Sequence, residues 1–240
     1  MERIVIAGVS GGIGKALAEA LLDRDDVAVI GLCREPARLS DWAAPAGERL
    51  TLLPWDAGSS GLDRAALPGD LELDGVIYAA GILHGEGLSP EKRLEDLSAD
   101  SLLHAYQVNA VGFPMLVQSL LPYLRHKRLK RLMAISAKVG SIGDNGFGGW
   151  YAYRASKAAL NMLVKNLSVE LPRRARPVTC VAVHPGTTRT ELSAPFQQSL
   201  AQLQVHDASD TAANLLGIYD GLAEADNGAF LSWDGSTLPW

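Results

Sequence analysis

Two side chains in the second half of the chain have the types and spacing needed to move a proton. Tyr153 and Lys157 stand four residues apart, so on a helix they share one face within reach of each other. A free tyrosine has a pKa of about 10 and is a poor acid–base catalyst near neutral pH, but a nearby ammonium group stabilises the phenolate and lowers that pKa. Such pairs also occur by chance on surface helices, so this candidate for acid–base catalysis needs support from the rest of the chain.

The start of the chain has the pattern of an anion-binding turn. Residues 4–7 form an apolar run that is long enough for a buried strand and too short for a helix. Gly8, Gly12 and Gly14 follow with the spacing G-x-x-x-G-x-G, which differs from the common dinucleotide pattern G-x-G-x-x-G. The next apolar residues share one helical face and are Ile13, Ala16, Leu17, Ala20 and Leu21. Because glycines let the backbone approach an anion and a helix start offers free N–H groups, we interpret the segment as a nucleotide site. The alternative is a tight strand-to-helix turn without a ligand.

The elements that would position these residues alternate along the chain. Short apolar runs predict strands at residues 4–7, 27–32, 50–53, 75–81, 132–136, 178–183 and 229–232. Helix-length segments separate most of them, notably residues 98–124 and 151–171. A stripe at helical spacing in the second segment consists of Leu160, Leu163, Val164, Leu167 and Leu171. The alternation predicts an α/β fold, a doubly wound parallel sheet of about seven strands with helices on both faces, in a single domain over residues 1–240.

Composition and charge argue against several classes of function. The chain has 240 residues, of which 48% are apolar and 20% charged, as in compact globular proteins. A formal net charge of −5 argues against nucleic acid or an anionic membrane as the main partner. No apolar run approaches the roughly 18 residues of a membrane span, and the first run breaks at Gly8, unlike a signal peptide. The two cysteines lie in apolar runs, as buried thiols do in a reducing compartment, so we expect a cytoplasmic protein. The five histidines lack metal-ligand spacing, so we expect no metal site.

Several motifs follow one another in an order that resembles one family. After the glycine loop come Ala79-Ala80-Gly81, Asn109, Tyr153-x-x-x-Lys157 and Pro185-Gly186. Together they resemble the short-chain dehydrogenase/reductase family over essentially the whole chain. The runs at residues 140–145, 149–161 and 184–186 are similar to the branch of sniffer-type carbonyl reductases and C-factor-like proteins, as are Trp-Asp-Gly at 233–235 and Pro-Trp at 239–240.

The resemblance implies a Rossmann-type sheet, a nicotinamide cofactor and a role for each matching residue. Tyr153 would donate a proton during carbonyl reduction, and Lys157 would lower the pKa of Tyr153 and hold the nicotinamide ribose. Asn109 would link Lys157 to solvent through a proton relay. Hydride delivery to a carbonyl carbon builds negative charge on the oxygen, which a poised O–H group neutralises. The residues assigned to the cofactor are Gly8, Ser10, Gly12, Ile13, Gly14, Arg34, Asp56, Ala57, Ala80, Gly81, Tyr153, Lys157, Pro185, Gly186 and Thr190.

These assignments predict an oxidoreductase that reduces a small carbonyl compound or oxidises the corresponding alcohol. The alternative is an NAD(P)-binding signalling or regulatory protein of the C-factor type with little or no turnover. The family builds its substrate lid where this chain has residues 187–205, and that stretch mixes polar and apolar residues without indicating a particular substrate.

The residue after the second predicted strand indicates which nicotinamide cofactor is used. Arg34 lies 20 residues beyond Gly14, where an acidic residue would bind the ribose 2′-hydroxyl of NAD. An arginine there can pair with a 2′-phosphate through a charge-assisted contact, and Ser10 could add a hydrogen bond. We therefore predict NADP(H) over NAD(H). The alternative is that Arg34 pairs with the neighbouring Glu35 on the surface.

One hydroxyl that the family usually has is missing. The family places a serine at the second position after the isoleucine of the fifth strand, where it hydrogen-bonds the substrate carbonyl, but here Ile135 is followed by Ser136 and then Ala137. Ser136 would point to the opposite face in a regular strand, unless a bulge turns it inward, and Ser141 could fold back from the following loop. We slightly favour Ser136 as the substitute. His184 replaces the asparagine that many members have before Pro-Gly, and we expect a structural role for it.

Two predicted helices carry small or apolar residues on more than one side. One is the helix at residues 151–171, and the other ends in Leu116, Leu120, Leu121 and Leu124. In the family these two helices form a dimer interface. We therefore expect a homodimer at least, with a well-covered monomer as the alternative.

Overall fold

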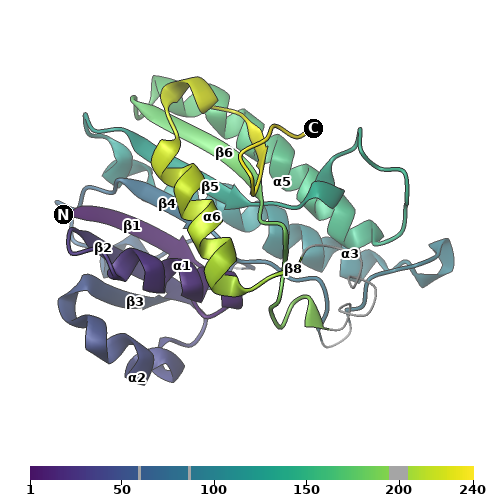
Figure 1. Cartoon of the computed structure of the whole chain (residues 1–240), viewed down its shortest axis with the longest axis horizontal. Helices are drawn as coiled ribbons and strands as arrows, with labels where there is room; N and C mark the ends of the chain where they lie inside the picture. Colours follow the sequence, from purple (N-terminus) through teal and green to yellow (C-terminus); the bar gives the residue numbers. More distant parts are fainter. Residues whose placement is uncertain (59–60, 86–87, 195–204) are drawn as a thin grey trace.

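The computed structural model describes residues 1–58, 61–85, 88–194 and 205–240. At its centre lies a parallel sheet in the order β3-β2-β1-β4-β5-β6-β9, which has seven strands within these ranges (Figure 1). The strands are β1 (Glu2–Ala7), β2 (Val27–Cys33), β3 (Leu50–Pro54), β4 (Gly75–Tyr78), β5 (Lys130–Ile135), β6 (Val178–His184) and β9 (Phe230–Ser232). The predicted α/β sheet and its seven strands are confirmed, with ends that shift by one to three residues.

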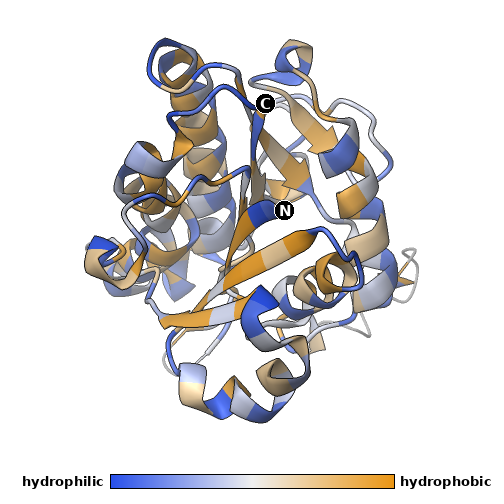
Figure 2. Ribbon diagram, turned by 90° about the vertical axis from the view of Figure 1, so that its left-hand side faces the viewer, coloured by the Kyte–Doolittle hydropathy of each residue, from blue (hydrophilic) through white to orange (hydrophobic). Residues whose placement is uncertain are grey.

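Helices cover both faces of the sheet because the central strands are apolar on both sides. Alternate residues of β1 belong to different cores: Val5 packs toward α4 (Gly112–Leu120) and α5 (Tyr151–Glu170), whereas Ile6 packs toward α1 (Gly12–Leu22) and α6 (Ala208–Gly221). The strands are accordingly among the most hydrophobic ribbons of the molecule (Figure 2). Near-continuous apolar strands of this kind are typical of parallel sheets buried on both faces.

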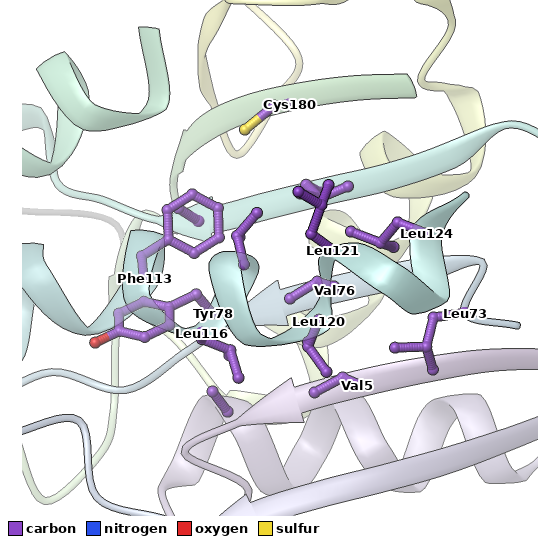
Figure 3. Packing of buried hydrophobic residues seen from close by; sticks show 14 of the residues in the cluster. Val5, Leu73, Val76, Tyr78, Phe113, Leu116, Leu120, Leu121, Leu124 and Cys180 are labelled. Carbon is purple, nitrogen blue, oxygen red and sulfur yellow. The ribbon is translucent and has the colours of Figure 1, made fainter. Parts of the chain in front are cut away.

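The core on the α4 side shows how strand and helix residues combine. Side chains of β1 and β4, including Val5 and Val76, meet Leu116 and Leu120 of α4, and Tyr78 packs against Phe113 with ring centroids 5.5 Å apart (Figure 3). The four leucines at residues 116, 120, 121 and 124 are all buried in this core. The subunit itself therefore covers this leucine stripe, and the expected dimer interface stays a prediction that other residues of the two helices must provide.

The order of the strands places a topological switch point between the loops after β1 and β4, the position of the ligand crevice in doubly wound sheets. From β1 the chain moves outward to β2 and β3, then returns to β4 on the other side of β1 and continues to β5 and β6. The loops after β1 and β4 therefore leave the sheet in opposite directions. Ligands of doubly wound sheets bind at this point, outside the carboxyl ends of the strands.

Two local features were not predicted. The segment at residues 98–124 contains α3 (Ala99–Tyr106) and α4 separated by a π-helical turn, η5 (Gln107–Val111). A short parallel pair, β7 (Thr187–Thr188) and β8 (Val205–His206), flanks the expected substrate lid, whose residues 195–204 lie outside the described residues. No helix in the described part of the chain is long and apolar enough to cross a membrane.

Candidate active site

The carboxyl edge of the sheet collects the residues that the motifs single out. Gly8 and Ser10 follow β1, Arg34 follows β2, and Asp56 with Ala57 follows β3. On the other side of the crevice, Ala80 and Gly81 follow β4, Ser136 follows β5, and Pro185 with Gly186 follows β6. Residues far apart in the sequence are thus brought to one edge, because parallel strands all end on the same side.

The glycine loop after β1 packs closely against the loop after β4. Gly8 has a φ of +85°, and a Cβ at this position would lie 2.7 Å from the backbone nitrogen of Ala80. A Cβ on Gly14 would collide with the carbonyl oxygen of Gly8. Only glycine fits at these two positions, so the loop can turn sharply into α1 while it stays against the crevice.

The start of α1 is suited to an anion. Its N-cap is Gly11, no side chain caps the helix, and the first turn contains no acidic residue. The backbone N–H groups of Gly12, Ile13 and Gly14 stand at the positive end of the helix dipole, where a phosphate is stabilised. Thr190, which follows β7, faces this turn, since a Cβ on Gly12 would lie 2.7 Å from the Thr190 methyl carbon. The residues present therefore fit a dinucleotide cofactor.

Arg34 is exposed directly after β2, the strand next to β1 in the sheet. The neighbouring Glu35 forms an ion pair with Arg38, with 2.8 Å between Nε and Oε2. In the described ranges no ion pair joins Arg34 to Glu35, so the surface pairing considered as the alternative for Arg34 is not observed. Ser10 is also exposed in the loop after β1.

Tyr153 and Lys157 lie together on the first turns of α5. The Lys157 ammonium nitrogen is 5.8 Å from the centroid of the Tyr153 ring and donates a hydrogen bond of 2.9 Å to the carbonyl oxygen of Ile135. Lys157 is buried, and this burial lowers its pKa to about 8. Burial also raises the pKa of Tyr153 to about 12. In the protein alone, desolvation of the phenolate therefore outweighs the attraction of the ammonium, contrary to the expected lowering.

Asn109 occupies the π-helical turn and is completely buried. Its side-chain oxygen accepts a hydrogen bond from the Ile82 amide at 2.7 Å, and its Nδ2 donates to the Ile82 carbonyl at 2.9 Å and to Ser156 Oγ at 3.0 Å. A Cβ on Gly81 would lie 3.2 Å from Asn109 Oδ1 and 3.6 Å from Lys157 Nζ. The structure thus brings Asn109, Gly81 and Lys157 together, while the predicted proton relay remains a prediction.

The comparison with known families agrees with this arrangement. Residues 2–201 match the family described as short chain dehydrogenase. The chain belongs to the short-chain dehydrogenase family. It is accordingly an oxidoreductase that depends on NAD(P), and the predicted family is confirmed.

Individual known proteins resemble this chain along most of its length. Short-chain dehydrogenase srdF of Neurospora crassa is 29% identical, covering 99% of this chain and 97% of that protein. C-signal of Myxococcus xanthus is 34% identical, covering 61% of this chain and 83% of that protein. The solved structure of carbonyl reductase Sniffer of D. melanogaster is 28% identical with a TM-score of 0.84, and the match covers 100% of both chains. Both predicted kinds of relative, sniffer-type and C-signal, are thus found.

The position of the missing serine of the family is filled by Ala137, which is buried at the end of β5. Ser136 Oγ donates a 2.6 Å hydrogen bond to Asn161 Oδ1 on α5, and Ser136 is 2% exposed. Asn161 lies eight residues beyond Tyr153, about 12 Å along the helix. The only hydroxyl hydrogen of Ser136 is thus committed to a residue two turns away, which argues against the preference for Ser136, and the catalytic role of this serine stays a prediction. Ser141, also buried, accepts a hydrogen bond from the Asp144 amide, which leaves its own O–H as a donor.

His184 ends β6 beside Ser136. Burial is the main cause that lowers the pKa of His184 to about 4, and the nearby positive charge of Lys138 adds to it, so the imidazole is neutral near neutral pH. Its Nδ1 is buried without a hydrogen-bond partner in the described ranges. After it, Gly186 has a φ of +78° and fits against the rings of Trp233 and His206. This packing ties the loop after β6 to β8 at the base of the expected lid.

Sequence reasoning missed three residues on or next to α5. Trp150 packs edge-on against the Tyr153 ring, with centroids 6.3 Å apart and an interplanar angle of 75°. The Glu91 carboxylate accepts a hydrogen bond from the Ala152 amide at the start of α5, and Asn161 Oδ1 accepts one from the Ser136 hydroxyl. Only the glycines at residues 148 and 149, directly before Trp150, signal an unusual turn there, and both have positive φ.

Proposed function

We propose that this protein reduces small carbonyl compounds with NADPH, or oxidises the corresponding alcohols with NADP. The observation that carries the proposal is the placement of Tyr153 and Lys157 on one face of α5, beside Gly81 and Asn109 at the crevice. The name of the similar structure, carbonyl reductase Sniffer, supports the same substrate class.

In this proposal the glycine loop, the start of α1 and Arg34 hold the cofactor, with Ser10, Asp56, Ala57, Ala80, Pro185, Gly186 and Thr190 lining its remaining length. Once bound, the nicotinamide supplies or accepts the hydride. Lys157, anchored by the Ile135 carbonyl, orients the cofactor ribose and contributes a positive charge near the phenol.

Tyr153 holds the proton that the reduction consumes. Because burial raises the pKa of its phenol to about 12, Tyr153 is protonated at neutral pH, as a proton donor must be. It donates this proton to the carbonyl oxygen as negative charge develops there. Asn109 fixes the backbone of Ile82 and the hydroxyl of Ser156, and it keeps the crevice beside Lys157 in shape.

A panel of aliphatic and aromatic aldehydes and ketones tests the function, with loss of nicotinamide absorbance as the readout. We expect turnover with NADPH for at least one member. The second candidate function, cofactor binding for signalling with little turnover, is favoured by Ala137 and by the hydrogen bond that occupies Ser136. Tight NADPH binding without turnover on any member would favour that second candidate.

Cofactor preference follows from Arg34 and makes a separate prediction. We expect Arg34→Ala to weaken NADPH binding by roughly 10- to 100-fold, the worth of a charge-assisted hydrogen bond, and to leave NADH binding nearly unchanged. Arg38→Ala, which removes the neighbouring paired arginine, is the matched control. Equal affinity for the two cofactors, unchanged in Arg34→Ala, would contradict the preference.

We further propose a homodimer formed through α3 and α5, in a protein of the cytoplasm, with residues 187–205 as the substrate lid of a single domain. The two helices pack against each other, and both present large exposed apolar side chains: Leu103 and Tyr106 on α3, Met162 and Val169 on α5.

A further inference from the structure

Helix α5, which carries Tyr153 and Lys157, begins without a capping side chain of its own. Its N-cap is Trp150, at φ 49° and ψ 45°, and no side chain of the helix start caps the first turn. This left-handed conformation is rare for a bulky residue and persists only where the surroundings impose it. Something outside the helix must therefore hold Trp150.

Glu91 holds this helix start from a segment 61 residues away in the sequence. The Glu91 carbonyl accepts a hydrogen bond from the Trp150 amide at 2.6 Å. Its carboxylate Oε2 accepts a second hydrogen bond from the Ala152 amide at 3.2 Å. A carboxylate at this end of a helix satisfies free N–H groups and complements the positive end of the dipole.

Both hydrogen bonds hold the backbone just before Tyr153. Ala152 directly precedes Tyr153, and the Trp150 ring packs against the Tyr153 ring. Glu91 therefore constrains both the backbone before Tyr153 and the aromatic neighbour of its side chain.

The burial of Glu91 indicates more than packing. The residue is 3% exposed, and its other carboxylate oxygen, Oε1, is buried without a hydrogen-bond partner among the described residues. Burying such a group is unfavourable, and a neutral side chain would fill the same space at lower cost. We attribute the presence of a hydrogen-bond acceptor at residue 91 to its contact with the backbone at the start of α5.

We propose that Glu91 is a positioning residue that fixes the first turn of α5 and thereby holds the Tyr153 phenol in place for proton transfer. This inference rests on the proposed function. A misplaced phenol lowers turnover, while the cofactor contacts on α1 stay untouched and Lys157 keeps its anchor on the Ile135 carbonyl, so the effect falls on kcat rather than on the KM for NADPH.

Three variants test it by steady-state kinetics and by hydrogen–deuterium exchange of residues 150–157. We expect Glu91→Ala to lower kcat at least about tenfold, with the KM for NADPH within about twofold and faster exchange at the start of α5. Glu91→Gln keeps an oxygen that can accept the Ala152 N–H, so it should restore most of the lost turnover. Glu95→Ala removes an exposed carboxylate of the same segment and is the matched control, expected to match the wild type.

A second substitution keeps the proposal testable if Glu91→Ala does not fold. Trp150→Gly suits the left-handed backbone, so it should fold, but it removes the ring from Tyr153 and should lower kcat. Wild-type kcat in either Glu91→Ala or Trp150→Gly overturns the proposal, as does a Glu91→Gln variant no better than Glu91→Ala. A wild-type protein without carbonyl turnover refutes the proposed function instead. In that case the hydrogen–deuterium exchange of residues 150–157 tests whether Glu91 fixes the start of α5. Unchanged exchange in Glu91→Ala overturns that role.

Discussion

At the scale of single residues, burial acts on Tyr153 and Lys157 in opposite directions. It raises the pKa of the phenol to about 12 and lowers that of the ammonium to about 8, because both charged forms lose water. Both shifts favour the neutral forms. The group that titrates near physiological pH is therefore Lys157 and not Tyr153.

The pH dependence of the reduction follows from these directions. Lys157 is charged below pH values of about 8 and loses its proton above, whereas Tyr153 stays protonated throughout this range. If the ammonium is required, kcat/KM for carbonyl reduction is level in the acidic range and falls about tenfold per pH unit on the alkaline side. Lys157→Arg keeps its charge and should shift this fall to higher pH. A level profile from about pH 7 to about pH 10 would show that the charge of Lys157 is not needed.

The two serines near the end of β5 make a second residue-scale prediction. Ser136→Ala leaves Asn161 Oδ1 without its buried donor and should cost about 1–3 kcal/mol of unfolding free energy, with less than about a tenfold loss of kcat. The loss of a donor to the substrate oxygen would instead cost roughly 3–4 kcal/mol in the chemical step.

Ser141→Ala is the companion variant, because the Ser141 hydroxyl accepts a hydrogen bond from the Asp144 amide and keeps its own hydrogen as a donor. A kcat loss of about a hundredfold or more in Ser136→Ala with unchanged unfolding would restore Ser136 as the residue that orients the carbonyl. The measurement pairs kcat with thermal unfolding for both variants.

At the scale of elements, the sequence predicts the sheet well because burial on both faces leaves a direct mark on it. The apolar runs in β1, β4 and β6 are continuous, and the glycine loop after β1 is set by local sterics at Gly8 and Gly14. Since all these strands are parallel, the residues that follow them had to meet at one edge. The positions of Arg34, Gly81 and Pro185 were predictable for that reason.

What the sequence could not indicate depends on contacts between distant segments. The hydrogen bond from Ser136 to Asn161 joins residues 25 apart, and the bond from Ala152 to Glu91 joins residues 61 apart. Neither pattern has a local signature. The π-helical turn that presents Asn109 was missed for a similar reason, because the apolar residues around it fit a continuous helix equally well.

At the scale of the whole molecule, the exposed apolar side chains of α3 and α5 predict self-association. We expect light scattering at micromolar concentration to give a mass about twice that of the 25.5 kDa chain. Met162→Asp places a charge on this surface and should shift the protein to the monomer. Ile142→Asp, at an exposed apolar residue of the loop before α5, is the control and should leave the mass unchanged. A wild-type mass of 25.5 kDa would contradict the dimer.

The most direct test of the central claim compares the wild type with Tyr153→Phe for NADPH-dependent reduction of the best carbonyl substrate, with NADPH affinity measured in parallel. The substitution removes one hydroxyl and keeps the ring that packs against Trp150. The account predicts a loss of at least about a hundredfold in kcat with NADPH affinity within about twofold, because the proton donor is gone and the cofactor site is intact. A Tyr153→Phe variant that keeps wild-type turnover would show that Tyr153 is not the proton donor.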